Sequence, residues 1–398
     1  MSTSNHQKIG LATATIVGMN AMIGAGIFSV PAIMASEVGP AGILTYIFVI
    51  IAVWFMAQSI ARVAQLYPEA GSFYTYTKPW AGHTGGLIAA FSYITGLLIA
   101  MGLLAKFAGI FLAWYFPTLS PFTLGLCTLG ALTLLNIVGV SLSQVGQYIL
   151  IICTVFPLLA VTGLCLSKAQ LTNLMPFAPH GYLSIFRATK VAIFGFFGFE
   201  CAASLFTIVK DPSKNVPRAL TVSIIIVGII YLLFVGSIIL STPLHLFTDP
   251  LIPITSVLKD VFPGNHMVIE LIHASMLSAV LGTIHSMIWS VSELLQSLCK
   301  MVKSGPIKFI TNNGWLTNTN AVLFVGVSIF LSYITFKNLD LFFNLTAIFI
   351  VFAYASSIIT LLTLETEWKS GRNIKTIIGL LTAAAIFAFA FEGLIASI

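Results

Sequence analysis

The sequence predicts an all-α protein that crosses a membrane about eleven times, and two observations lead to this fold class. First, 58% of its 398 residues are hydrophobic and only 8% are charged, whereas soluble proteins carry roughly 25% charged residues. So few charged side chains cannot cover the surface of a soluble chain of this length. Second, apolar stretches long enough to cross ~30 Å of hydrocarbon recur along the whole chain. Lipid must therefore be the solvent for much of the surface.

Eleven apolar stretches are candidate spans, because each approaches or exceeds the ~20 residues that a membrane-crossing helix needs. They are 9–36, 41–66, 84–116, 121–140, 147–167, 184–209, 218–241, 267–299, 319–336, 338–364 and 374–397. The connections are short, and the longest, 242–266, is rich in proline and predicts a loop with a short interfacial helix. We therefore expect a single transmembrane domain over 1–398.

The charged and cysteine residues exclude several classes of function. The net charge is +6, but the basic residues lie in short loops and form no stripe, so no nucleic-acid partner is expected. Most lysines and arginines lie in loops on the same side of the membrane as the amino terminus. Because such residues are enriched in cytoplasmic loops, this predicts a cytoplasmic amino terminus in an inner membrane. The first apolar stretch is too long for a signal peptide and is expected to stay as a span. The five cysteines form no CxxC pair, so we expect no disulfide framework, no metal site and no cofactor.

Glycine pairs interrupt the first and the sixth span. Span one contains Gly24 and Gly26 with Pro31 just beyond, and span six contains Gly195 and Gly198. Glycine costs ~1 kcal/mol relative to alanine inside a helix, and proline removes a backbone donor. Unwound backbone is tolerated inside a membrane only where it faces protein or a water-filled cavity. Both spans are therefore predicted to be broken helices.

Two such breaks suit a substrate that carries both charges of an amino acid. The amide donors at the start of a half-helix can hold a carboxylate, and carbonyls freed at the other half can meet an ammonium group or a cation. Glycine-interrupted spans at corresponding positions of two halves are typical of the binding site of a transporter. The alternative is that the glycines only allow close packing between helices.

Several motifs together carry a resemblance to a known family. They are Gly24–Phe28 in span one, Tyr67–Tyr76 after span two, Leu135–Gly139 at the end of span four, Gly198–Glu200 in span six and Val209–Arg218 after it. With them the chain resembles the amino acid/polyamine/organocation transporter superfamily from about Lys8 to Thr335. The resemblance implies two inverted five-helix repeats in a LeuT-like core, with discontinuous helices 1 and 6. The repeats would cover about 9–167 and 184–364, followed by an extra helix at about 374–397.

The resemblance also implies a function and a set of site residues. It implies alternating access with proton- or sodium-coupled uptake, or exchange of one amino acid for another. The substrate carboxylate would meet amides near Gly24, Ala25 and Gly26, and the ammonium would meet carbonyls near Ile23 and in Phe194–Phe197. The expected substrate-binding residues are Ile23, Gly24, Ala25, Gly26, Ile27, Tyr93, Phe194, Gly195, Phe196, Phe197, Gly198 and Ser286. The expected coupling or gating residues are Glu200, Phe194, Tyr93 and His285, with Phe194 and Tyr93 matching aromatic gate positions of the bacterial arginine–agmatine exchangers.

The sequence departs from the family at three points, of which the first leaves proton coupling open. Thr154 stands where many proton-coupled members carry a lysine in span five, and Arg62 stands where an acidic residue is usual. Most members also have twelve spans, against about eleven expected here. Glu200 either links protonation to gating or accepts a structural hydrogen bond, and His285 is either a proton relay or a packed hydrogen-bonding residue. Lys106 in span three either pairs with an acidic group or reaches the membrane surface.

The favoured substrate is a neutral or hydrophobic amino acid, because aromatic and apolar residues surround the breaks. A polyamine or cationic amino acid antiporter is the alternative. A membrane-embedded enzyme or channel is more distant, since the sequence contains no HExxH, no GxSxG and no repeated filter. The expected partners are the amino acid, H⁺ or Na⁺ and the lipid bilayer, and the oligomeric state stays open.

Overall fold

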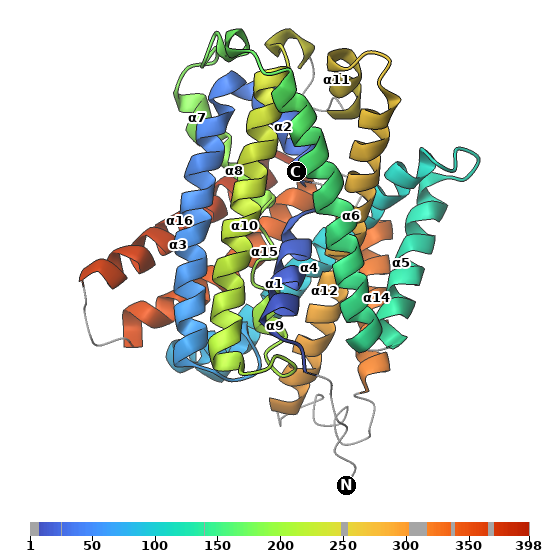
Figure 1. The fold of residues 1–398 in the computed structure, drawn as a ribbon. Coiled ribbons are helices and arrows are strands. Elements are labelled where there is room, and N and C mark those ends of the chain that lie inside the picture. The colour runs from blue at the N-terminus through green and yellow to red at the C-terminus, as the bar shows by residue number, and fades with distance from the viewer. Residues whose placement is uncertain are drawn as a thin grey trace.

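The computed structural model describes residues 8–24, 26–138, 140–247, 254–301, 317–335, 339–364 and 370–397. Within these ranges nine helices are long and apolar enough to cross a membrane, and a bent helix pair brings the number to ten. Figure 1 shows α3, α6 and α10 running roughly parallel, with α16 crossing them obliquely. The all-helical membrane fold predicted from the sequence is thereby confirmed.

The helices lie close to the stretches predicted from the sequence. The long ones are α3 (Gly42–Leu66), α4 (Phe73–Ala113), α5 (Pro121–Val138), α6 (Val140–Ser167), α10 (Pro212–Ser241), α12 (His266–Met301), α14 (Asn318–Thr335), α15 (Leu339–Leu364) and α16 (Ser370–Ser397). The broken spans comprise α1 (Leu11–Met22) and α2 (Gly26–Glu37), and α7 (Leu183–Arg187), α8 (Thr189–Phe194) and α9 (Cys201–Ser204). Short elements connect them: η1 (Gly39–Ala41), η2 (Leu171–Leu174), η3 (Leu244–Leu246) and α11 (Ile254–Val261).

Span one is broken where the sequence predicts, and span six is interrupted more severely. α1 and α2 meet at a bend of 53°. In the 184–209 stretch, six non-helical residues separate α8 from α9, and Gly198 has a φ of +108° that glycine adopts without strain. The prediction that span six is a discontinuous helix is thereby confirmed, and the stretch consists of three short helices, none long enough to cross alone.

α4 comprises two helical stretches that meet at a kink, because Gly82 has a non-helical φ of +71°. The second stretch begins directly after Gly82, close to the start predicted for span three near residue 84. The long loop after α10 contains η3 and the eight-residue helix α11, as expected for 242–266, although 248–253 lie outside the described residues.

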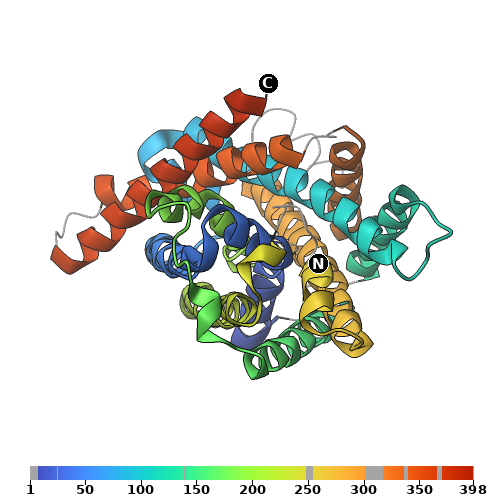
Figure 2. The same ribbon diagram turned by 90° about the horizontal axis from the view of Figure 1, so that it is seen from above.

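The helix packing repeats itself in a way that supports two related halves. α4 packs on α15 as α12 packs on α6, and α4 packs on α14 as α12 packs on α5. α4, α5 and α6 are spans three, four and five, and α12, α14 and α15 are spans eight, nine and ten. Replacing each span of the first half by its counterpart in the second half, and the reverse, therefore converts each contact into the other. Viewed from above, α1, α3 and α10 form a compact group, with α4, α12 and α15 beside it (Figure 2). The boundaries of the two repeats stay a prediction.

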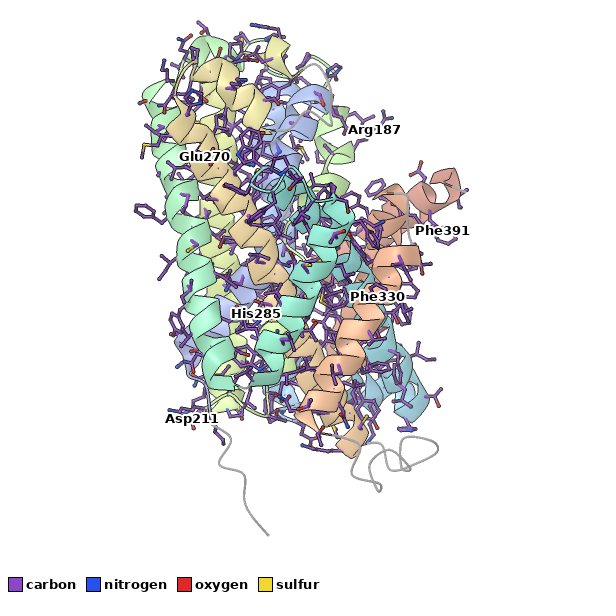
Figure 3. The ribbon with its side chains drawn as sticks, turned by 90° about the vertical axis from the view of Figure 1, so that its right-hand side faces the viewer. Arg187, Asp211, Glu270, His285, Phe330 and Phe391 are labelled. Atoms are coloured by element: carbon purple, nitrogen blue, oxygen red, sulfur yellow. The ribbon has the colours of Figure 1, made fainter. Side chains whose placement is uncertain are left out.

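Charged residues mark the two ends of the molecule. Figure 3 places Asp211 at one end and Glu270 and Arg187 toward the other, with His285 between them. At the Asp211 end, Ile9 forms a bridge with Val209, and its amide donates to the carbonyl of Ile208 at 2.8 Å. The chain before span one and the chain after span six are thus joined at this end. We call the two ends the Asp211 end and the Glu270 end.

Candidate functional site

The two broken spans touch each other through their glycines. A Cβ placed on Gly26 would lie 3.2 Å from the Cα of Gly195. A Cβ on Gly198 would lie 2.7 Å from the carbonyl oxygen of Ala21, closer than real Cβ contacts come. The glycines predicted from the sequence are therefore the residues that bring the two breaks together. Ala25, which was predicted to bind the substrate carboxylate together with Gly24 and Gly26, falls outside the described residues.

Tyr231 of α10 connects the two breaks. Its hydroxyl lies 2.8 Å from the carbonyl oxygen of Met22 and 2.9 Å from that of Gly195. Met22 ends α1 and Gly195 directly follows α8, so both carbonyls lie where a regular helix stops. The amide of Gly24 also donates to the Met22 carbonyl at 2.9 Å, and the tyrosine adds a side-chain donor at both helix ends. The tyrosine is fully buried and packs edge-on against Phe196, with ring centroids 5.0 Å apart.

Thr283 of α12 supports the first break from the opposite side. Its hydroxyl lies 2.7 Å from the carbonyl oxygen of Asn20 and 3.2 Å from that of Ile23. It also lies 3.0 Å from the carbonyl oxygen of Ala279, one turn earlier in α12. Four oxygens from two elements thus converge at the end of α1.

A hydrogen-bonded chain of side chains extends from α1 to α6 and α12. The amide of Asn20 donates to Oε1 of Gln147 at 2.6 Å, and the hydroxyl of Ser286 donates to the same oxygen at 2.8 Å. All three residues are buried. Ser286 is therefore connected to α1, just before the first break, by hydrogen bonds through Gln147. Its contact with substrate remains a prediction.

His285 faces a different neighbour from Ser286. Its Nε2 lies 3.0 Å from the carbonyl oxygen of Ser143, and its Nδ1 lies 2.8 Å from the amide nitrogen of Asn136. A carbonyl only accepts, so Nε2 donates and Nδ1 accepts, which fits a neutral ring. The buried ring connects α12 to α5 and α6 rather than to the breaks, and its predicted gating role stays untested.

Glu200 is the last residue of the second break and is completely buried. Its Oε2 accepts a hydrogen bond from the hydroxyl of Tyr354 in α15 and a 3.2 Å bond from the amide of Gly198. The carboxylate therefore folds back on its own break and joins it to span ten. Such an intramembrane carboxylate is costly and usually functional.

The predicted gate aromatics lie at the two ends of one chain of ring contacts, which runs from Phe194 through Phe197, Tyr354 and Phe73 to Tyr93. Phe194 packs against Phe343 of α15, with centroids 4.5 Å apart, and against Phe197 at 5.8 Å. Tyr93 packs against Phe73 at 4.4 Å, and its hydroxyl lies 4.0 Å from the sulfur of Cys201. Phe194 belongs to the chain before the second break and Tyr93 contacts the chain after it.

The predicted residues around the breaks come together, whereas their partners escaped the sequence analysis. Ile23, Gly24, Gly26, Ile27, Gly195, Phe196, Phe197 and Gly198 are all buried at or beside the breaks. The residues missed are Tyr231, Thr283, Tyr354 and Asn20. Each is a hydroxyl- or amide-bearing side chain within an apolar span, which was the available signal.

Comparison with known proteins agrees with this geometry. A family model described as amino acid permease matches residues 9–397. The branched-chain amino acid permease BcaP of Bacillus subtilis is 26% identical over 57% of this chain and 53% of its own. A probable GABA permease of Pseudomonas aeruginosa is 26% identical over 75% of this chain and 66% of its own. The cationic amino acid transporter 1 of Arabidopsis thaliana is 25% identical over 57% and 41%. The chain spans between 41% and 66% of the length of these three relatives.

A solved structure shares the whole fold. The crystal structure of MhsT in complex with L-phenylalanine superposes with a TM-score of 0.71, covering 98% of this chain and all of that one at 14% identity. A similarity of this kind concerns the fold alone. It confirms the LeuT-like arrangement with discontinuous helices 1 and 6.

Proposed function

Because the chain belongs to the amino acid permease family, we propose that it carries an amino acid across the inner membrane by alternating access. The observation that carries the proposal is the contact between two broken spans, at Gly26 with Gly195 and at Gly198 with Ala21. Backbone polar groups leave their helices at both places, and such groups are costly in lipid unless they serve a partner or a cavity. The amino terminus is proposed to face the cytoplasm.

The breaks suit the two charged groups that every amino acid shares. The amino-terminal end of α2 begins at Gly26 and directs its first amides and its positive dipole toward the break. We propose that these amides hold the substrate carboxylate. The ammonium is proposed to meet carbonyls of Ile23 and of the stretch from Phe194 to Phe197. In the structure, the hydroxyl of Thr283 donates to the Ile23 carbonyl and that of Tyr231 donates to the Gly195 carbonyl.

A neutral or hydrophobic amino acid is the proposed substrate. Phe194, Phe196 and Phe197 surround the second break with apolar surface. Of the Glu200 carboxylate, Oε2 accepts hydrogen bonds from Tyr354 and Gly198, whereas Oε1 has no hydrogen-bond partner among the described residues. The preference for an uncharged side chain therefore rests on the aromatic residues. The names of BcaP and the GABA permease fit an uncharged or zwitterionic substrate, whereas that of the cationic transporter keeps a polyamine or cationic amino acid as the alternative.

The driving force is proposed to be a cation gradient or exchange for a second amino acid. Carbonyls at unwound helix ends are the groups that coordinate Na⁺ or H⁺ in such carriers. The carbonyls of Asn20 and Ile23 at the end of α1, together with the Thr283 hydroxyl, form an oxygen cluster of this type. Uptake into vesicles with a sodium gradient, a proton gradient or internal amino acid separates the three cases.

Counterflow in proteoliposomes tests the carrier mechanism. Vesicles preloaded with an unlabelled amino acid should take up the labelled one faster than empty vesicles, because a carrier that returns loaded exposes its site again to the labelled substrate. A thermal-shift screen with the twenty amino acids identifies the substrate to use. The carrier mechanism would be ruled out if preloading left uptake unchanged for every amino acid that raises the melting temperature.

A further inference from the structure

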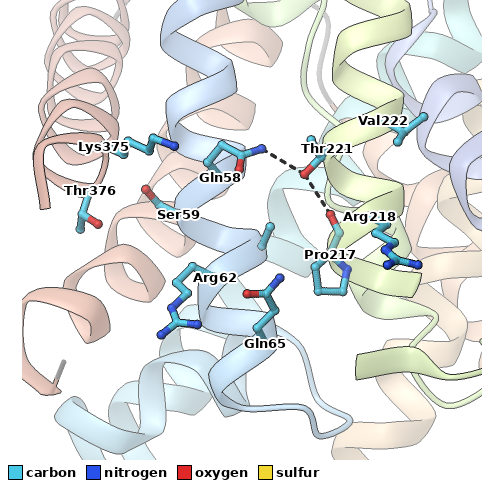
Figure 4. A pocket seen from close by; sticks show the side chains of 11 residues that line it. Gln58, Ser59, Arg62, Gln65, Pro217, Arg218, Thr221, Val222, Lys375 and Thr376 are labelled. Atoms are coloured by element: carbon cyan, nitrogen blue, oxygen red, sulfur yellow. Dashed lines mark hydrogen bonds between the residues drawn. The ribbon is translucent and has the colours of Figure 1, made fainter. Parts of the chain in front are cut away.

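A polar cleft lies between three helices away from the breaks. It occupies about 410 Å³ between α3, α10 and α16, and Figure 4 shows it with Lys375 reaching from α16 toward α3. Three basic residues line it, Arg62, Arg218 and Lys375, and the described residues that line it include no aspartate or glutamate. The lining comes from the carboxyl-terminal turns of α3 and the first turns of α10 and α16, which places the cleft at the Asp211 end.

Contacts within the protein hold the walls of the cleft in place. The side-chain amide of Gln58 in α3 donates to the hydroxyl of Thr221 in α10 at 3.0 Å. The ammonium of Lys375 lies 5.2 Å from the ring centroid of Trp54, a cation–π contact. α16 also approaches α3 closely, since a Cβ on Gly379 would lie 3.1 Å from the Ser59 hydroxyl. The cleft is therefore a built feature between packed helices.

The charge of the cleft favours an anion. Arg62 is half-buried, whereas Arg218 and Lys375 are exposed, and all three line the same space. Like charges gathered in one cleft add their potentials, which raises the local concentration of anions. Guanidinium groups match the oxygens of a phosphate through paired hydrogen bonds, and an ammonium adds a point charge.

The surroundings of the cleft indicate where that anion comes from. Val222 of α10 lines the cleft and is 38% exposed. Ile377 in α16 and Leu66 in α3 each follow a lining residue in sequence and are both 39% exposed. Exposed apolar side chains on membrane helices face acyl chains. A ligand with an anionic head and apolar tails can pair with the basic residues of the cleft and also contact the exposed apolar side chains. A small soluble anion can only pair with the basic residues.

We propose that this cleft binds the phosphate headgroup of an anionic phospholipid from the leaflet at the Asp211 end. Basic pockets between transmembrane helices on the cytoplasmic side are suited to such headgroups. The bound lipid would join α16, which lies outside the two repeats, to α3 and α10. This proposal is independent of the transported substrate.

Native mass spectrometry of the full-length protein, released from vesicles of phosphatidylcholine with phosphatidylglycerol, tests the proposal. We expect one retained phosphatidylglycerol, and affinity for it should fall roughly fivefold for each basic group that is removed. The variants are Arg62→Gln, Lys375→Gln and their combination with Arg218→Gln. Arg62→Lys keeps the charge and should retain most of the binding, which separates loss of charge from misfolding.

Two exposed lysines at the same end, Lys78 and Lys300, provide the matched control. The Lys78→Gln and Lys300→Gln variants remove equal charge outside the cleft and should keep the retained lipid. Equal lipid retention in the cleft variants and these controls would overturn the proposal. Displacement of the lipid by millimolar inorganic phosphate would instead assign the cleft to a soluble anion and also overturn it.

Discussion

Gly198 is the residue at which the backbone of the second break is most constrained. It combines a φ of +108° with a Cβ position 2.7 Å from the carbonyl oxygen of Ala21. Any other residue must bear the strain of a sparsely populated backbone region and separate the two spans. The glycine is thus required both for its conformation and for the close approach.

Replacing Gly198 by alanine should therefore lower stability and transport together. A residue held in such a region costs about 1–3 kcal/mol, and the steric contact with Ala21 adds to it. Gly236→Ala is the control, because this helical glycine of α10 has open space around its Cβ position. Thermal melting in detergent measures the difference. Equal melting temperatures for the two variants would contradict the assigned constraint.

Glu200 offers a second prediction at the residue scale. Glutamine in its place can still accept hydrogen bonds from Tyr354 and Gly198 but cannot take up or release a proton. If Glu200 links protonation to gating, Glu200→Gln should fold normally and lose the pH dependence of transport. The exposed carboxylate of Glu270 supplies the control variant Glu270→Gln. An unchanged pH profile in Glu200→Gln would assign the carboxylate a structural role.

The residue scale also shows where prediction from sequence stops. The glycine pairs were identified because glycine and proline mark breaks locally, within a few residues. Tyr231 contacts Met22 across 209 residues of sequence, and Thr283 contacts Ile23 across 260. No local pattern encodes such pairings, since they depend on how the helices pack. A tyrosine or threonine in an apolar span is visible, but its partner is not.

At the scale of elements, α10 and α12 act as supports for the broken spans. Tyr231 extends from α10 to both breaks, and Thr283 extends from α12 to the first. The span boundaries were predictable because apolar length determines them. The glycine pair predicted a break in span six, but the division of the stretch before it into α7 and α8 was not predictable, because apolar content does not determine backbone hydrogen bonds.

Removing the Tyr231 hydroxyl should weaken substrate binding as well as stability. Tyr231→Phe leaves two buried carbonyls without their shared donor, at a cost of about 1–3 kcal/mol. Tyr333→Phe is the matched control, since that hydroxyl donates to the carbonyl of Phe122 at 3.0 Å, away from the breaks. Isothermal titration with the identified amino acid compares them. Equal affinities in both variants would show that Tyr231 does not organise the site.

The hydroxyl of Thr283 can be tested with a pair of substitutions. Thr283→Val keeps the shape and removes the donor to the carbonyls of Asn20 and Ile23, so transport should fall at least tenfold, as a loss of ~1.4 kcal/mol would produce. Thr283→Ser keeps the hydroxyl and should restore most of the rate. Initial uptake rates in vesicles give the comparison. Similar rates for valine and serine variants would exclude a role for the oxygen.

At the scale of the whole molecule, the orientation in the membrane follows from charge. The predicted cytoplasmic side includes the loop at Asp211, and the opposite side includes the loop at Asn173 between α6 and α7. In a cysteine-free background, an impermeant maleimide added to whole cells should label the Asn173→Cys variant and not the Ser213→Cys variant. Permeabilised cells should show labelling of both. The reverse pattern in whole cells would invert the orientation.

The single proton of the Tyr231 hydroxyl has a consequence for motion. One proton lies within reach of two acceptors that belong to different broken spans, so it can serve either of them fully but not both at once. If the two spans part during the proposed alternating access, the hydroxyl can keep one acceptor while it gives up the other. The separation then costs less at this residue than the loss of two full hydrogen bonds.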